Sequence, residues 1–165
     1  MRLTTRSRFA VTAMLELAIE YDLSTSVSLS LISERHNISV SYLEQLFLKL
    51  RKKSLVNSVR GSNGGYYLSK SPNEIVVTDI IFAVDDILDA TACKGKANCK
   101  KDNNGNFSKC ITHDLWSSLS QKMFEYLSSI SLQNLLDTKN FSNRKPDPLN
   151  YLSHRDNCIN EIVYL

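Results

Sequence analysis

Residues 37–70, "NISVSYLEQLFLKLRKKSLVNSVRGSNGGYYLSK", hold the patterns that decide the fold of this chain. In the first half, apolar residues recur at the spacing of a helix, and these are Val40, Leu43, Leu46, Phe47 and Leu50. The second half has two short alternating runs around "GSNGG", which predict a hairpin with Val56, Val59, Tyr66 and Leu68 on its buried side. A helix followed directly by such a hairpin is typical of a winged helix.

The polar residues around the first helix of this stretch indicate where it begins. Asn37 or Ser39 can cap it, and Ser41 with Glu44 has the spacing of a capping box. Residues 28–36 predict a short preceding helix, joined to it by the brief "NIS" connection. The two helices form a helix-turn-helix pattern, although an ordinary helical hairpin has the same pattern.

The outer face of the second of these helices is polar and basic, as expected of a helix that enters the major groove of DNA. Glu44 can accept a hydrogen bond from cytosine N4, and Gln45 can make paired hydrogen bonds to adenine. Arg60 stands at the root of the hairpin, from which an arginine can reach the minor groove. The further predicted DNA contacts are Ser39 at the helix start and the phosphate-binding Ser41, Tyr42 and Arg51.

Charge is unevenly distributed along the chain. Residues 1–70 hold ten Lys and Arg against five Asp and Glu, whereas residues 71–165 hold ten against twelve. A basic first half indicates a polyanionic partner, although chance asymmetry of a surface would look the same. The "GSNGG" turn lacks the Lys-Ser/Thr pair of a nucleotide-binding loop, so it is not expected to hold a nucleotide.

The remaining segments complete a mostly α (α+β) fold. An amphipathic helix is predicted at residues 8–22, and another is predicted to start near Thr78 with Ile80, Ile81, Val84 and Ile87 facing inward. Residues 111–137 predict one long apolar helix that pairs with a second copy, unless it packs back on the winged domain. The expected division is a winged helix-turn-helix domain (1–75), a connecting helix with a cysteine loop (76–110), a dimerisation helix (111–137) and a flexible tail (138–165).

The cysteine loop collects metal-binding side chains in the pattern Cys93-x5-Cys99-x10-Cys110-x2-His113. Three thiols and one imidazole suit zinc or an iron–sulfur cluster, and the spacing does not separate the two. Neighbouring lysines would lower the pKa of these thiols and favour thiolates. Free thiols or a disulfide are the simpler alternatives. Cys158 lies far away in the tail and is expected to be a bystander.

Several classes of protein are disfavoured. The sequence has no apolar run long enough for a membrane span and no recognisable signal peptide, so a cytoplasmic protein without a membrane partner is expected. Disulfides are rare in that compartment. No nucleophile–base pair is recognisable, which argues against an enzyme. A redox or electron-transfer protein would explain the cysteines but leave the winged helix without a purpose.

The chain resembles the IscR family of iron–sulfur cluster regulators over residues 1–137. The matching segments are "MRLTTRSRFAVTAMLELA", "SVSYLEQLFLKLRKKSLVNSVRGSNGGYYL", "DATACKGKANC" and "CITHDLWSSLS". The resemblance implies a homodimer that binds double-stranded operator DNA and regulates genes for iron–sulfur cluster assembly. It also implies a [2Fe-2S] cluster, supplied by the assembly machinery and held by Cys93, Cys99, Cys110 and His113.

The sequence departs from this family at the gap between Cys99 and Cys110, which is usually about as short as the gap between Cys93 and Cys99. Asn103, Asn104 and Gly105 indicate that the extra residues form a turn that loops out without moving the cluster ligands. The tail beyond residue 138 has no recognisable counterpart. Sibling regulators that sense nitric oxide, redox state or cysteine supply, or that bind zinc or no metal, are the alternatives, because a fold does not fix its signal.

Overall fold

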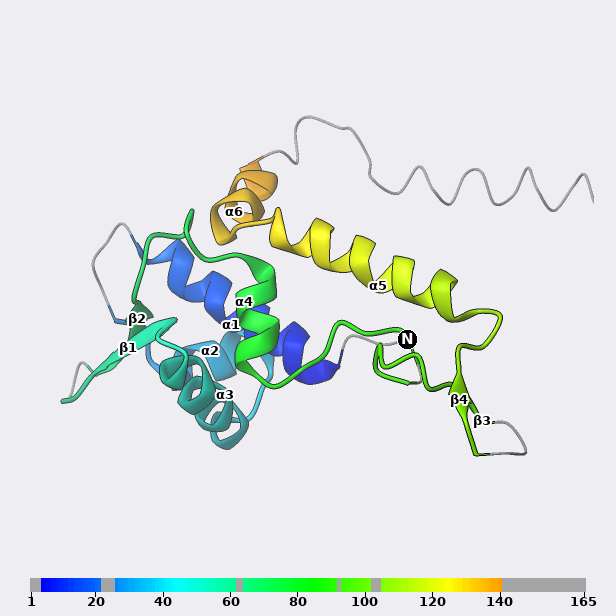
Figure 1. Ribbon diagram of the computed structural model, residues 1–165. Coiled ribbons are helices and arrows are strands. Elements are labelled where there is room, and N and C mark those ends of the chain that lie inside the picture. The colour runs from blue at the N-terminus through cyan, green and yellow to red at the C-terminus, as the bar shows by residue number, and fades with distance from the viewer. Residues whose placement is uncertain (1–3, 22–25, 62–63, 92, 102–104, 141–165) are drawn as a thin grey trace, which may run out of the picture.

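The structure is a computed structural model that describes residues 4–21, 26–61, 64–91, 93–101 and 105–140 (Figure 1). Its helices are α1 (Thr5–Ile19), α2 (Leu29–His36), α3 (Val40–Lys52), α4 (Val77–Ala83), α5 (His113–Ser128) and α6 (Leu132–Asn140). Its strands are β1 (Val56–Val59), β2 (Gly65–Leu68), β3 (Lys100–Lys101) and β4 (Phe107–Ser108). Figure 1 shows a helical body with the β1–β2 wing at one end and α5 leading to the β3–β4 hairpin at the other.

The helix-turn-helix is formed by α2 and α3, and side-chain caps define both helix starts. The hydroxyl of Ser28 accepts a hydrogen bond from the Leu31 amide, and that of Ser39 accepts one from the Tyr42 amide. Asn37 ends α2 in the left-handed conformation (φ 53°), which asparagine tolerates better than most residues. Ser39 is thus the cap, as predicted, and the capping box expected at Ser41 is wrong, because Ser41 already lies inside the helix.

The wing is a two-stranded antiparallel sheet in which Val56 pairs with Leu68 and Val59 with Gly65. Val27 adds a short bridge to Tyr66 on the outer side of β2. A Cβ on Gly65 would lie 2.5 Å from the Val27 carbonyl oxygen, so this close approach requires glycine. Val59 was predicted to be buried but is 48% exposed, because the wing has already left the core at that residue.

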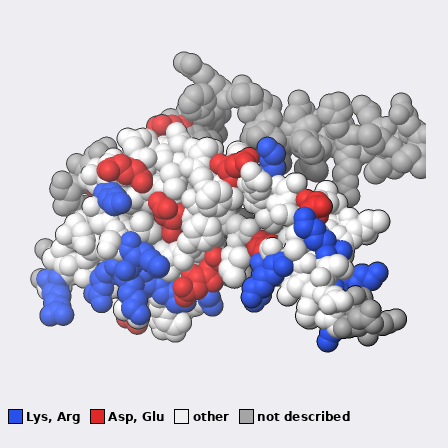
Figure 2. All heavy atoms as spheres, in the orientation of Figure 1, with Lys and Arg blue, Asp and Glu red and all other residues white. Residues whose placement is uncertain are grey.

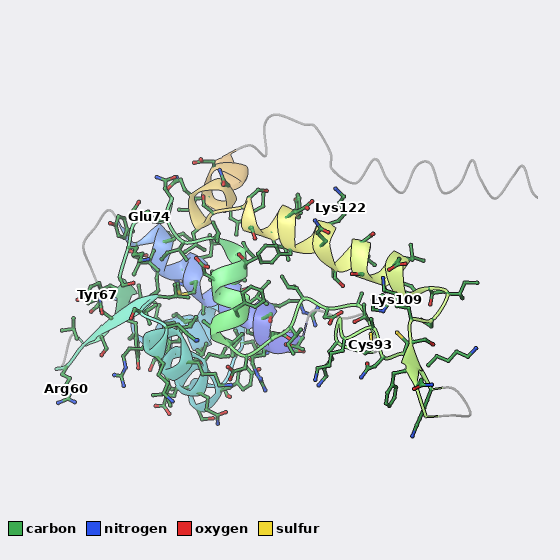
Figure 3. All side chains as sticks on the ribbon, in the orientation of Figure 1. Arg60, Tyr67, Glu74, Cys93, Lys109 and Lys122 are labelled. Atoms are coloured by element: carbon green, nitrogen blue, oxygen red, sulfur yellow. The ribbon has the colours of Figure 1, made fainter. Side chains whose placement is uncertain are left out.

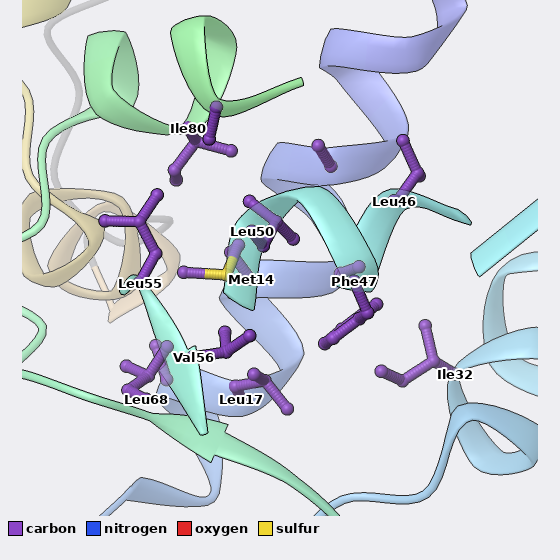
Figure 4. Close-up of a cluster of buried hydrophobic side chains, with 14 of the residues drawn as sticks. Met14, Leu17, Ile32, Leu46, Phe47, Leu50, Leu55, Val56, Leu68 and Ile80 are labelled. Atoms are coloured by element: carbon purple, nitrogen blue, oxygen red, sulfur yellow. The ribbon is translucent and has the colours of Figure 1, made fainter. Parts of the chain in front are cut away.

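One continuous core joins α1, α2, α3, the wing and α4 (Figure 4). Phe47 lies at its centre, fully buried, with its ring centroid 4.6 Å from that of Tyr66. A side chain of this size contributes about 1.5–3 kcal/mol when it is fully buried. The other large, fully buried side chains are Met14, Leu17, Ile32, Leu43, Leu46, Leu50, Val56, Ile75, Ile80, Ile81 and Leu132. Val40, which was predicted to face this core, is 38% exposed.

The single helix predicted for residues 111–137 is wrong, since α5 ends at Ser128 and α6 begins at Leu132. The break has a tertiary cause. The Val77 amide donates to the Ile130 carbonyl and the Leu132 amide donates to the Ile75 carbonyl, so the chain is extended there. Leu132 is fully buried and α6 packs on α1, which means that this part of the predicted helix folds back on the winged domain.

The helix α4 also differs from its prediction. Val76 rather than Thr78 occupies the cap position, and the buried Thr78 hydroxyl accepts a hydrogen bond from Ser128 on α5. The helix ends at Ala83, so Ile87 lies beyond it and is 66% exposed. The predicted tail falls outside the described residues from position 141 onward. Among the described helices, none has the length and hydropathy needed to cross a membrane.

Candidate DNA-binding surface and metal site

The helix α3 presents most of the predicted DNA contacts at the surface. Ser41, Glu44, Gln45 and Arg51 are exposed on it, and Ser39 is exposed at its start. Because Ser39 caps the helix, Glu44 is not needed as the partner of a Ser41 cap.

Two contacts fix how the predicted DNA-binding residues are presented. Tyr42 is half-buried, and its ring packs edge-on against Phe9 with 6.0 Å between centroids, so this side chain also braces α3 against α1. Arg51 donates to the Ser58 hydroxyl at 3.4 Å, which links α3 to the wing. Arg60 is exposed near the end of the wing (Figure 3).

Basic side chains gather along the lower face of the molecule in Figure 2, beneath α3 and the wing. The exposed ones on α3 and the turn after it are Arg51, Lys52 and Lys53, with Arg60 on the wing. A cluster of this kind is the electrostatic footprint expected of a surface that binds a polyanion.

Sequence reasoning missed the acidic side chain that holds the helix-turn-helix in place. Glu16 lies on α1 and is only 7% exposed. Its carboxylate accepts from Arg35 at 2.6 Å and contacts the His36 Nε2 at 2.9 Å. Burial alone would raise the pKa of the Glu16 carboxyl, but these two hydrogen bonds outweigh burial and lower it. A charged residue inside the apolar "MLELA" run is the signal that could have revealed it.

Three of the four predicted metal ligands come together at the start of α5. The Sγ atoms of Cys93 and Cys99 lie 3.4 Å apart, and the His113 Nδ1 lies 3.4 Å from the first and 3.2 Å from the second. All three ligand atoms lie within 4.8 Å of one another. His113 is buried at the first turn of α5, whereas Cys93 is half-buried and Cys99 exposed. This convergence is a possible metal site.

Cys110 lies beside this group and not within it. Its Sγ is 3.6 Å from the Thr112 hydroxyl, and its thiol and that of Cys99 affect each other's ionisation. The backbone of Cys110 donates to Cys99 and lowers the pKa of that thiol, but partial burial and the two neighbouring thiols raise it above its ordinary value overall. Hydrogen bonds from the hydroxyl and backbone amide of Thr112 lower the pKa of Cys110. Cys110 is therefore adjacent to the site without sharing its centre.

Cys93 is the most acidic of the three thiols. Partial burial would raise its pKa, but hydrogen bonds from the Cys99 thiol, the Thr91 hydroxyl, the Ala97 amide and His113 lower it to about 6. The chain curls around this sulfur, with Lys94 and Ala97 at positive φ (54° and 56°). A thiol with this pKa is largely thiolate at neutral pH, which is the form that binds metals.

Hydrogen bonds and an ion pair connect residues 85–89, which precede the cysteines, to α1, to α3 and to the start of the cysteine loop. The Asp86 carboxylate accepts from the Thr4 and Ser7 hydroxyls at the start of α1. Asp85 forms an ion pair with Lys49 of α3 at 2.8 Å. Asp89 accepts from Thr91, beside the cysteines. The helix α3 and the start of the cysteine loop therefore both contact the short segment that contains Asp85, Asp86 and Asp89.

The extra residues between Cys99 and Cys110 form the β3–β4 hairpin, in which Lys101 pairs with Phe107. These residues do project as a hairpin, but Cys110 after them does not join Cys93, Cys99 and His113, so the expectation that the ligands stay together is not met. Gly105 has a φ of 87°, which glycine adopts readily. Residues 102–104 lie outside the described residues, so the predicted roles of Asn103 and Asn104 stay predictions.

Comparisons with known proteins agree with the fold. A sequence model of the Rrf2 family, described as "Iron-dependent Transcriptional regulator", matches residues 3–138. The "HTH-type transcriptional regulator IscR" of Photorhabdus laumondii is 50% identical over 139 residues, which cover 84% of this chain and 81% of that protein. The structure named "T. potens IscR" matches with a TM-score of 0.68 and 31% identity, covering 92% of this chain and 96% of that one.

A further solved structure widens the range of signals found on this fold. CymR, named "the Global Cysteine Regulator of B. subtilis", matches with a TM-score of 0.66 and 29% identity, covering 84% of this chain and 98% of that one. The winged-helix architecture predicted from residues 37–70 is confirmed by these neighbours.

Proposed function

Because this chain belongs to the Rrf2 family of transcriptional regulators, we propose that it senses a [2Fe-2S] cluster and thereby controls genes for iron–sulfur cluster assembly. Family membership confirms the coarser prediction of a DNA-binding transcriptional regulator that is not an enzyme. The observation that carries the finer proposal is the convergence of Cys93, Cys99 and His113 beside Cys110.

The chemistry of these four side chains fits the group. Thiolates are the usual ligands of iron–sulfur clusters, and a histidine can replace a cysteine. When bound, the cluster would supply a cofactor whose presence reports the cellular supply of iron and sulfide. His113 would be the weakest ligand, because a neutral imidazole can be displaced by a proton. Cys110 would complete the set from its position beside Cys99.

The same geometry leaves one other candidate open. Three ligand atoms within 4.8 Å of one another are close enough to bind a single metal ion such as zinc. Ligation by Cys110 distinguishes the two, since it lies outside that compact group. Regulation by cysteine supply or redox state, as in a CymR-like protein, would require no metal at this site.

The segment Val84–Asp89 offers a physical route from the cysteine loop to DNA. It lies directly before the loop and is bound on one side to Lys49 of α3 and on the other to Ser7 of α1. A bound cofactor would order the loop. The ordered loop would change the conformation of this segment and, through its contact with Lys49, the position of α3. In that position Glu44 and Gln45 would read bases, Ser41, Tyr42 and Arg51 would hold phosphates, and Arg60 would reach the minor groove.

The helix α5 would form the homodimer interface. One side of it is occupied, with the Phe124 ring stacked on Phe82 of α4 at 6.1 Å between centroids. Large apolar side chains remain exposed along the rest of the helix, and these are Leu115, Trp116, Leu119 and Tyr126. An apolar surface of this extent on a single helix is usually buried by a partner. A dimer would place two recognition helices on the two halves of a palindromic operator.

The proposal is tested by anaerobic purification followed by visible absorption and by iron, sulfide and zinc analysis. We expect a coloured protein that contains iron and sulfide in equal amounts. The Cys110→Ser variant should lose the colour, whereas the matched Cys158→Ser variant should keep it. Stoichiometric zinc, or no metal after reconstitution, would contradict cluster sensing and leave a regulator with another signal. Transcript levels of cluster assembly genes with the wild type and the Cys110→Ser variant then test the regulatory role.

A further inference from the structure

The β3–β4 hairpin has no part in the function proposed above, yet its chemistry is distinctive. Residues 93–110 hold five lysines and one acidic residue, in a half of the chain that is otherwise acidic. All the described residues of β3 and β4 are exposed, and Phe107 is 62% exposed. The hairpin therefore adds a basic, partly aromatic projection next to the cysteines.

Most of the lysines in this stretch have no carboxylate partner among the described residues. Lys109 forms an ion pair with Asp114 at 2.9 Å. For Lys94, Lys96, Lys100 and Lys101, no carboxylate of the described residues lies within ion-pair distance. The ammonium group of Lys101 lies 5.7 Å from the centre of the Phe107 ring, which holds the side chain along the hairpin. These positive charges are available to an external anion.

The β3–β4 hairpin faces the same side of the molecule as α3 and the wing, the elements proposed to bind DNA. In Figure 1, α3 and the β3–β4 hairpin lie along the lower side and the wing slopes down toward it from the left end, while α5 and α6 form the upper side. Figure 2 shows basic side chains beneath the helical body and again at the hairpin, with fewer of them on the upper side. A long polyanion bound to α3 and the wing is therefore the occupant that the arrangement favours.

We propose that the β3–β4 hairpin is a further DNA contact, in which Lys100 and Lys101 bind backbone phosphates outside the bases read by α3 and the wing. The inference rests on the DNA binding of the proposed function. Contacts to phosphates carry no sequence information, so the hairpin adds affinity without changing base preference. Phe107 would lie against the sugar edge of the backbone while it holds Lys101 in place. An acidic protein surface is the competing partner.

The salt dependence of binding gives the expected size of this effect. Each phosphate neutralised on duplex DNA changes the slope of log affinity against log salt by about 0.9. Two lysines therefore account for a slope of nearly 2. Between 50 and 200 mM salt, this corresponds to roughly a tenfold change in affinity for each hairpin that touches DNA.

The test uses the full-length chain, purified anaerobically. It also uses two DNA duplexes that carry a site selected from a random pool by binding to the wild-type protein. The short duplex spans only the selected site, and the long one adds about one helical turn of random sequence on each side. The variant is Lys100→Gln with Lys101→Gln. Its matched control is Lys70→Gln, which removes an exposed lysine that follows β2 and lies outside the proposed dimer interface. Equal metal content of variant and wild type verifies that the neighbouring Cys99 is undisturbed.

On the long duplex, the double variant should show a smaller salt slope, so that the advantage of the wild type over it is about tenfold larger at 50 mM than at 200 mM salt, while its binding to the short duplex stays unchanged. The Lys70→Gln control should match the wild type on both. Equal affinity and slope of the double variant on the long duplex would overturn the inference and leave an acidic protein as the partner. Loss on both duplexes alike would also overturn it. Failure of the proposed function looks different, because then the wild type enriches no duplex from the random pool.

Discussion

Replacement of Glu16 by glutamine tests whether a buried carboxylate on α1 holds the helix-turn-helix in position. Glutamine keeps the size of the side chain and one carbonyl acceptor but removes the charge. The variant therefore loses the charge-assisted parts of two contacts, those with Arg35 at 2.6 Å and with His36 at 2.9 Å. The turn between α2 and α3 directly follows His36, so the placement of α3 depends on this anchor.

The size of the effect follows from exposure. A hydrogen bond to a charged group contributes about 1.5–3 kcal/mol when it is buried, and exposed ion pairs contribute about 0–1 kcal/mol. The Glu16 side chain is 9% exposed, but those of Arg35 and His36 are 43% and 29% exposed. Solvent screening at the partners reduces the loss, so we expect the free energy of unfolding to fall by about 1–2 kcal/mol. For a chain of this length, that is a decrease in Tm of roughly 2–8 °C.

Urea unfolding followed by circular dichroism measures this loss in metal-free protein at neutral pH. The matched control is Glu20→Gln, because Glu20 is 3.9 Å from the same Arg35 and 23% exposed. The control should change the free energy of unfolding by less than about 0.5 kcal/mol. The Glu16 variant should also bind operator DNA more weakly than the control. A Glu16→Gln protein as stable as the control would refute the reasoning.

The pH dependence of the same difference provides a second check. The pKa of Glu16 is lowered in the folded protein, so its contribution is fully present above the unfolded value of about 4.3 and is lost as pH falls through the folded value. In a His36→Gln background, which leaves the Arg35 pair alone, the stability lost on Glu16→Gln should therefore be constant from pH 7 to about pH 5 and shrink at lower pH. A difference that grew on acidification would contradict the assigned ion pairs.

Three further measurements test the α3 cap, the wing glycine and the Cys93 thiol. Ser39→Ala should lower the free energy of unfolding by about 1 kcal/mol through loss of the α3 cap, whereas Ser41→Ala should stay within about 0.5 kcal/mol of the wild type in urea unfolding. Gly65→Ala should destabilise the protein by about 1–3 kcal/mol, because the new methyl group meets the Val27 carbonyl, and amide exchange should localise the effect to the wing. In metal-free protein, the alkylation rate of Cys93 should rise through about pH 6; a rate that still climbed steeply near pH 8.5 would contradict the lowered pKa.

The winged helix could be predicted because its signals are local. The spacing of Leu43, Leu46, Phe47 and Leu50 defines a helix, and the glycine-rich turn defines a hairpin, without knowledge of any distant residue. All four of those side chains are buried in the structure. The start of α3 could also be predicted, because the serine cap forms a hydrogen bond to an amide only three residues away.

The break between α5 and α6 could not be predicted in the same way. Apolar residues continue at helical spacing from Leu127 to Leu135, so the pattern does not change where the helix ends. The helix ends at Ser128 because backbone groups of Ile75 and Val77, about 55 residues away in sequence, hydrogen-bond to Ile130 and Leu132. Tertiary pairing of this kind overrides a continuous pattern and leaves no sign in the local sequence.

The candidate metal site shows both the reach and the limit of sequence spacing. Cys110 and His113 are three residues apart at a helix start, which predicted that both would point the same way. In the structure His113 joins Cys93 and Cys99, while Cys110 stays beside them. Residue types identify the candidate ligands, but the path of the chain decides which of them meet, and here that path includes the β3–β4 hairpin.

The proposed connection between the candidate metal site and the DNA-binding surface depends on Asp85, which belongs to no motif recognised in the sequence. Asp85 adopts a φ of 59°, which is unfavourable for most residues but tolerated by aspartate. The hydrogen bond from Lys49 lowers the pKa of its carboxyl, so the pair stays charged well below neutral pH. Only seven residues separate Asp85 from Cys93. Because Asp85 is held by α3 and the segment after it leads directly to the cysteine loop, any reordering of the loop that reaches Asp85 must change either the Asp85 backbone or its contact with α3.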